Sequence, residues 1–209
     1  MAATDVVTDQ GPGFLLVLLL AAGPCAHALE LMAPEQVIAT TADAFATAVE
    51  TRRAELEADL QGDYAFVDEY LLPRFDFASA CRLILREHWK QAMPEQRQRF
   101  ADAFYRHLVA SYGKALLEFR HDTIAVLPAR EDATGTSAHV RTKVKLTDGG
   151  IFDVDFYMRL DDRGWRVVDV IAEGVSYVRT YRSEFGMEIR ASSLEALTAR
   201  LEESTDRER

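Results

Sequence analysis

The sequence predicts an α+β protein in which helices pack on one face of an antiparallel sheet. Apolar residues recur every three or four positions from residue 34 to about 119, which is typical of amphipathic helices. The period changes to two between residues 123 and 172, where Asp- and Gly-rich turns separate alternating segments, and it returns to the helical spacing from residue 175. No repeat, low-complexity tract or linker divides the chain, so one domain is expected.

Six segments carry the helical pattern. They cover residues 34–60, 64–72, 76–91, 94–119, 175–189 and 194–203. Pro34 and Pro94 suit the first turn of a helix, where a missing backbone N–H is tolerated. Asp76 is expected to cap the third helix, and Pro73 stops the segment before it.

Four segments carry the strand pattern, and the turns between the last three are short. The expected strands cover residues 123–127, 137–147, 151–160 and 165–172. One face of the two best strands is apolar and carries Val140, Thr142, Val144, Leu146, Phe152, Val154, Phe156, Met158 and Leu160. The other face sets Arg141, Lys143 and Lys145 against Asp153 and Asp155. This second face is interpreted as solvated cross-strand ion pairs, because catalytic carboxylates would not be matched by so many cations.

A curved sheet with one apolar face and helices laid over it has two possible interiors. Side chains can fill the space completely, or they can leave an apolar cavity. The alternation alone does not choose between these outcomes, since the same residues would serve both.

The N-terminal segment is predicted to be a signal peptide. Residues 14–22 form an apolar run of nine residues, whereas a membrane-spanning helix needs about 20. Ala26 and Ala28 then supply a small-x-small cleavage site, so the signal peptide is assigned to residues 1–28 and the mature domain to 29–209. Residues 1–13 lack the usual Lys or Arg. A short buried helix, or a lipoprotein signal ending at Cys25, is the alternative.

The charge balance excludes some partners. The chain has 24 Lys plus Arg against 34 Asp plus Glu and a formal net charge of −10. Nucleic-acid affinity comes mainly from cations that neutralise phosphates, so no nucleic-acid partner is expected. Broad electrostatic attachment to anionic lipid surfaces is disfavoured for the same reason.

No well-marked catalytic or metal motif is present in the sequence. It lacks a His-Glu-x-x-His run and a Gly-rich phosphate loop, and removal of Cys25 would leave Cys81 alone. Cys81 is interpreted as a small buried residue and not a reactive thiol. Ser176 follows Gly174 but lacks the second glycine of a hydrolase nucleophile elbow. We therefore expect no enzyme activity, no metal site and no cofactor.

Three blocks of sequence resemble the MlaC family of periplasmic phospholipid-binding proteins, also called toluene-tolerance auxiliary proteins. The most specific is Ile171-Ala172-Glu173-Gly174-Val175-Ser176, which follows a predicted strand. The others are Glu69-Tyr70-Leu71-Leu72-Pro73 with Trp89-Lys90-Gln91-Ala92-Met93-Pro94, and Phe100-x3-Phe104-x7-Tyr112. One departure is Arg86, which stands where many members of the family carry glycine.

The resemblance implies a curved NTF2-like or cystatin-like sheet that encloses an apolar cavity for lipid tails. It also implies a monomeric periplasmic carrier that holds bound phospholipid as cargo. Such a carrier would shuttle lipids between an outer-membrane lipoprotein–porin complex and an inner-membrane ABC transporter with an MCE-domain subunit. This activity would maintain the lipid asymmetry of the outer membrane. A hopanoid-associated carrier of the same family and a small NTF2-like enzyme are the alternatives.

The resemblance also favours a cavity over a filled core. The hypothetical lining consists of Phe104, Leu108, Tyr112, Val140, Val144, Phe152, Val154, Phe156 and Met158. Gly174 is expected to turn the chain from strand to helix, with Ser176 or Glu173 as the helix cap. Arg179, Tyr181 and Arg182 either meet a lipid phosphate or form a solvated helix face.

Overall fold

A computed structural model describes residues 32–58, 62–117, 124–145 and 149–208, all within the unit Leu31–Arg209. The predicted signal peptide 1–28, its cleavage site near Ala28 and the alternative at Cys25 lie outside the described residues. Residues 118–123 and 146–148 lie outside the described residues too. They contain the end of the helix predicted over 94–119, the start of the strand predicted over 123–127 and the end of the strand predicted over 137–147. In the described ranges no helix is long and apolar enough to cross a membrane.

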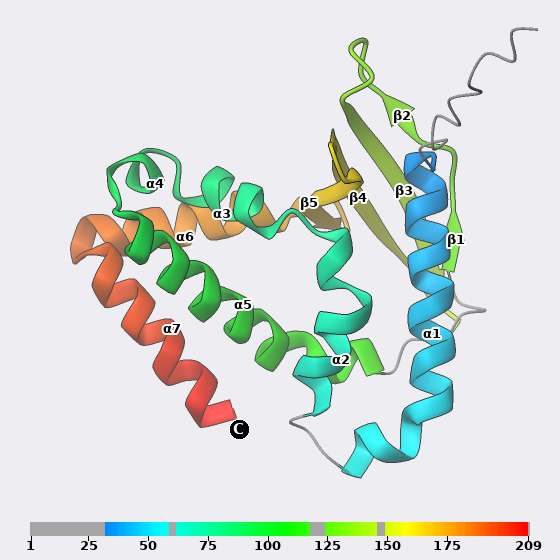
Figure 1. Cartoon of the computed structure of the whole chain (residues 1–209), viewed down its shortest axis with the longest axis horizontal. Helices are drawn as coiled ribbons and strands as arrows, with labels where there is room; N and C mark the ends of the chain where they lie inside the picture. Colours follow the sequence, from blue (N-terminus) through cyan, green and yellow to red (C-terminus); the bar gives the residue numbers. More distant parts are fainter. Residues whose placement is uncertain (1–31, 59–61, 118–123, 146–148, 209) are drawn as a thin grey trace, which may run out of the picture. The chain divides into compact units, whose positions relative to one another are not determined.

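The predicted α+β class is confirmed, with helices on both sides of the strand region in the sequence (Figure 1). The helices are α1 (Pro34–Ala58), α2 (Gly62–Tyr70), a 3-10 turn η1 (Leu72–Arg74), α3 (Phe77–Leu85), α4 (Glu87–Gln91), α5 (Pro94–Leu117), α6 (Tyr177–Ala191) and α7 (Leu194–Glu208). The strands are β1 (Ile124–Val126), β2 (Arg130–Glu131), β3 (Ser137–Lys145), β4 (Ile151–Asp161), β5 (Gly164–Ala172) and β6 (Val175–Ser176).

The strands form one antiparallel sheet in the order β1-β3-β4-β5-β6, and β2 also pairs with β3. The expected number of four strands was wrong, because β2 and β6 add two strands of two residues each. Two residues are too few to show an alternating pattern, so their sequence carries no strand signal. A β-bulge between Tyr157 and Met158 shifts the pairing of β4 with β5.

The charged face of the sheet differs in part from its prediction. Lys143 and Asp153 form the expected pair, with Nζ 2.9 Å from Oδ1. Asp155 lies opposite Arg141 in the register, but its Oδ2 is 3.1 Å from Nε2 of His139. The Lys143–Asp153 pair is exposed and therefore contributes little stability.

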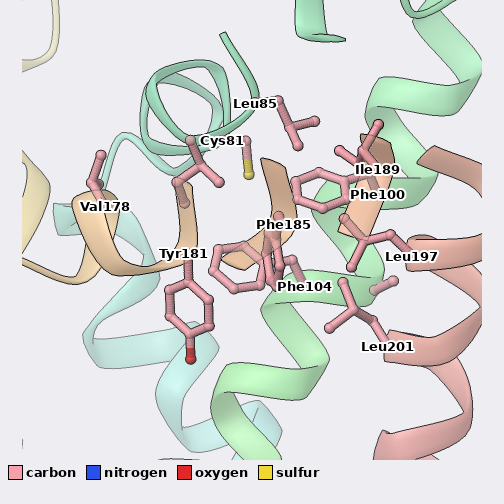
Figure 2. Close-up of a cluster of buried hydrophobic side chains, with 12 residues drawn as sticks. Cys81, Leu85, Phe100, Phe104, Val178, Tyr181, Phe185, Ile189, Leu197 and Leu201 are labelled. Carbon is pink, nitrogen blue, oxygen red and sulfur yellow. The ribbon is translucent and has the colours of Figure 1, made fainter. Parts of the chain in front are cut away.

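The largest core cluster lies among α3, α5, α6 and α7 and is shown in Figure 2. Phe104 of α5 is 2% exposed and lies among four aromatic rings. Its ring centroid is 4.8 Å from Tyr181, 5.3 Å from Phe185, 5.6 Å from Phe77 and 5.7 Å from Phe100. Two further clusters lie between α1 and the sheet and between α1 and α2.

The helix expected over residues 76–91 is broken at Arg86, which separates α3 from α4. Asp76 caps α3 as predicted, because its Oδ1 accepts a hydrogen bond of 3.1 Å from the Ser79 N–H. Arg86 has φ 51° and ψ −112°, a conformation that glycine adopts freely and other residues rarely adopt. The helical spacing of apolar residues continues across this break, so the periodicity gave no warning of it.

Replacing Arg86 with glycine is expected to stabilise the fold by about 1 kcal/mol, because glycine removes the backbone strain. Denaturant unfolding of the variant and the parent protein measures the difference. Arg82→Gly is the control: Arg82 lies inside α3, where glycine should destabilise by about 1 kcal/mol. A destabilised Arg86→Gly variant would contradict the assignment of strain.

Arg166 on β5 fastens the sheet to the start of α3. Its side chain is 9% exposed, and its guanidinium donates to Asp161, with Nε 3.0 Å from Oδ2. A second nitrogen lies 3.3 Å from the Phe75 carbonyl, and a third lies 3.4 Å from Asp76 Oδ2. The guanidinium therefore contacts the β4–β5 turn and the N-terminal end of α3 together.

Acid pH is expected to weaken this connection. Partial burial raises the pKa of Asp161, but hydrogen bonds from the Arg166 side chain and the Arg163 N–H outweigh it and lower the pKa below the ordinary value. A carboxyl whose pKa is lower in the folded state stabilises the fold above its unfolded pKa of about 4. That contribution is lost as pH falls through the folded pKa.

The free energy of unfolding, measured by denaturant titration between about pH 6 and 3, should therefore fall less steeply with acidification in Asp161→Asn than in the parent protein. Identical slopes in the two proteins would show that Asp161 is not linked to folding.

Candidate functional site

One face of the sheet is apolar in β1, β3, β4, β5 and β6, whereas β2 places Glu131 opposite Ala138 at its margin. Cross-strand partners share a face, so the register defines this inner face directly. Its apolar part and Thr142 comprise Ile124, Val126, Ala138, Val140, Thr142, Val144, Phe152, Val154, Phe156, Met158, Leu160, Trp165, Val167, Val170, Ala172 and Val175. The inner face predicted for β3 and β4 is confirmed for the residues that the structure describes, and it extends over the neighbouring strands. Leu146 of the predicted face lies outside the described residues.

One end of the inner face is closed by packing. Val140 and Met158 are fully buried, and the cluster that contains them also contains Val37 and Ile38 of α1. Phe156 packs against the same cluster. At this end of the inner face, these side chains pack in the core.

The other end of the inner face is only partly covered. We call it the open end and define it as Ile124, Val144, Phe152, Val154, Ala172 and Val175. The first five are partly buried, and Val175 is 56% exposed. None of the six belongs to a core cluster in the described part of the chain. Apolar side chains that are gathered in one place and left partly exposed are typical of a binding site for an apolar ligand.

The polar residue Thr142 does not interrupt the apolar character of the inner face. Thr142 is 1% exposed, and its hydroxyl donates a hydrogen bond to the carbonyl of Val154. Because the hydroxyl is satisfied within the sheet, it presents no unpaired donor to the open end.

The nine predicted lining residues separate into three groups. Val144, Phe152 and Val154 meet at the open end, and their role as a lining remains a prediction. Val140, Phe156 and Met158 lie at the closed end of the same face. The three residues of α5 lie apart from the inner-face cluster: Phe104 and Leu108 pack in the helical cluster, and Tyr112 is 39% exposed with its ring 5.7 Å from Tyr177.

The prediction missed Ile124, Ala172 and Val175. The alternation that identifies β4 also runs through Val170 and Ala172, so this signal was present in the sequence. Val175 could not have been found in the same way, because β6 has only two residues.

The corner between β5 and α6 has the structural role that was expected. Glu173 and Gly174 have φ 47° and 77°, and this turn brings β6 back against β5. Ser176 caps α6, since its Oγ accepts from the Arg179 N–H at 3.1 Å and donates to Asp169 at 2.5 Å. Glu173 is not the cap. Its carboxylate accepts from the Asp153 N–H at 2.6 Å and so ties the corner to β4.

Two of the three polar residues suggested for phosphate contact, Tyr181 and Arg182, have other partners. Tyr181 is 9% exposed and packs in the helical cluster. Burial raises the pKa of Tyr181, and its hydrogen bond with Tyr112 adds to this shift, so the phenol stays protonated. Arg182 donates from Nε to the Leu83 carbonyl at 2.9 Å, whereas the side chain of Arg179 is exposed.

Metal-binding and thiol chemistry were also considered. Within the described ranges, no three His, Cys, Asp or Glu side chains are grouped to hold a metal ion. Cys81 is completely buried and unpaired, and burial raises the pKa of its thiol. The thiol is therefore protonated and inaccessible, as its sequence context indicated.

The chain is similar in sequence and in structure to known proteins. The family model "MlaC protein" matches residues 39–203. The toluene tolerance protein ttg2D of Pseudomonas putida is 29% identical over 171 residues, which cover 81% of this chain and 79% of that protein. A phospholipid-binding protein of Ralstonia solanacearum, solved in complex with a phospholipid, is similar with a TM-score of 0.78 and 26% identity, over 85% of this chain and 99% of that chain. This chain belongs to the MlaC family.

Proposed function

We propose that the protein is a periplasmic carrier that binds the acyl chains of a phospholipid at the open end of its inner face. The observation that carries the proposal is the apolar, partly covered surface formed by Val144, Phe152 and Val154. The similar solved protein from Ralstonia solanacearum is in complex with a phospholipid, which supports this choice of ligand.

The free energy of burial makes an apolar surface sufficient for such a ligand. Each buried methylene contributes about 0.8 kcal/mol, so a chain of about 16 carbons represents on the order of 10 kcal/mol. A lipid that leaves a bilayer gains little of this, because bilayer and binding site are both dry. Loading and unloading can therefore be nearly isoenergetic, and an ATP-consuming partner would supply the direction.

The same magnitude favours transfer through docked complexes, because exposing the tails to water would create a large barrier. The proposed route runs between an outer-membrane lipoprotein–porin complex and an inner-membrane ABC transporter with an MCE-domain subunit. It would maintain outer-membrane lipid asymmetry. A signal peptide at residues 1–28 would deliver the carrier to the periplasm.

Native mass spectrometry tests the proposal. The full chain is expressed in a Gram-negative host with its own N-terminal segment and purified from the periplasmic fraction. Lipid extraction then identifies any bound molecule. Diacyl phospholipid bound to the protein is the expected result. Bound hopanoid would identify the other carrier type, and an empty protein would contradict the carrier function.

Val154→Glu is expected to reduce bound phospholipid at least tenfold, because a carboxylate at the open end would have to lose its water against lipid tails. Ile151→Glu is a matched control on the same strand. Ile151 is 65% exposed and lies outside the inner face, opposite Lys145. Native mass spectrometry of both folded variants measures their lipid occupancy. Full occupancy in Val154→Glu, or equal loss in both, would refute this location of the site.

A further inference from the structure

A second concave surface lies away from the inner face, where α3, α4 and α6 come together (Figure 1). We call it the arginine groove. It has a volume of about 390 Å³ and is lined by Arg82, Leu83, Arg86, Glu87, Trp89, Lys90 and Arg182. The gathering of four cations here contrasts with the net charge of −10 on the whole chain.

The charge of the groove is not neutralised by its neighbours. Lys90 pairs with Glu87, with 2.9 Å between Nζ and Oε1. In the described part of the chain, Arg82, Arg86 and Arg182 have no carboxylate partner. Four cationic side chains thus line the groove together with one carboxylate, that of Glu87.

Two of the residues that line the groove, Leu83 and Trp89, are apolar and partly buried. Arg97 stacks on Trp89, with its guanidinium carbon 5.6 Å from the ring centroid, and donates to the Trp89 carbonyl at 2.7 Å. Arg182 is positioned in the same way by its hydrogen bond to the Leu83 carbonyl. The groove therefore combines the cationic side chains with the aromatic side chain of Trp89.

The conformation of Arg86 is a second, independent observation. Arg86 has φ 51°, and a glycine at this position would relieve the backbone strain. The residue present is nevertheless a large cation whose side chain lines the groove. Backbone strain of this kind clusters at functional sites. The guanidinium of Arg86 offers a physical reason for retaining the strained residue.

We propose that the arginine groove binds an acidic segment of a partner protein. Carboxylates of the segment would pair with Arg82, Arg86 and Arg182, whose planar guanidinium groups suit bidentate contact with carboxylates. An apolar side chain of the segment would contact Trp89. A flat anionic bilayer fits less well, because the surface is concave and the rest of the protein is acidic. Free phosphate would make no contact with the apolar side chains of Leu83 and Trp89.

Trp89 supplies a direct readout. The chain has two tryptophans, and Trp165 is 7% exposed in a core cluster away from the groove. The probe is an eight-residue peptide with four glutamates and two leucines, titrated into the full chain at low salt. Saturable change in Trp89 fluorescence is expected. The change should be absent with a peptide that carries glutamine in place of glutamate, and it should vanish in Trp89→Phe.

Arg86→Gly is the decisive variant, because it removes the guanidinium and relieves strain. Its Kd for the peptide should rise about tenfold or more, as expected for loss of a charged hydrogen-bonded contact, while the fold is retained. Arg190→Gln removes one exposed cation of α6 outside the groove and should leave Kd unchanged.

Three results would overturn the proposal. They are no saturable binding of the peptide, equal weakening by Arg86→Gly and Arg190→Gln, and a fluorescence response to phosphatidylglycerol vesicles or inorganic phosphate in place of the peptide. The measurement does not depend on bound lipid, so its failure would leave the carrier function untouched.

Discussion

Replacing Phe104 with alanine should lower the free energy of unfolding by about 3–5 kcal/mol. The side chain is 2% exposed and contacts rings from α3, α5 and α6. Truncation removes its burial and also leaves a cavity that these neighbours cannot easily fill, because their own positions depend on one another.

Denaturant unfolding measures this loss, and Phe104→Leu is its control. Leucine retains most of the apolar volume and should cost clearly less than alanine. The location of Phe104 also predicts that lipid occupancy of the folded Phe104→Leu protein stays unchanged. Selective loss of lipid with little loss of stability would instead place Phe104 in the lipid site.

Replacing Arg166 with methionine should destabilise the protein by about 3–5 kcal/mol. Methionine keeps much of the apolar stem, so the effect reports mainly on the guanidinium. Its removal takes the buried guanidinium away from the Phe75 carbonyl, Asp76 and Asp161, and it disconnects the β4–β5 turn from the start of α3.

Arg163→Met provides the matched control for Arg166→Met. Arg163 also approaches Asp161, at 3.7 Å, but its side chain is 67% exposed. An exposed ion pair contributes at most about 1 kcal/mol, so the control should unfold at nearly the parent denaturant concentration. Equal effects of the two substitutions would show that burial of Arg166 adds nothing to its pairing.

The alternating segments of the sequence were the most informative part of it. In β3 and β4, apolar and polar residues alternate with a period of two, and this alternation determines which side chains share a face. It does so independently of the element that packs on that face. This is why Val144, Phe152 and Val154 could be placed together before the structure was known. Asp76, Gly174 and Ser176 were predictable for a related reason: a helix cap or a tight turn depends on a few neighbouring backbone groups.

The covering of the sheet could not be predicted in the same way. The stripe of Phe104, Leu108 and Tyr112 shows that α5 has an apolar face, but periodicity does not say which element meets it. In the structure Phe104 packs with α3 and α6. The helix break at Arg86 was not predicted from the pattern, because glycine, which favours such a conformation, is absent from that position.

The continuous pairing of β3 with β4 has a consequence for the proposed binding of a lipid. The ladder runs without a shift from Ser137 opposite Arg159 to Lys145 opposite Ile151, through the closed and open ends alike. The backbone beneath the open end is therefore held by the same hydrogen bonds as the core. The surface is preorganised, and an arriving ligand loses its own freedom without having to order the strands that receive it.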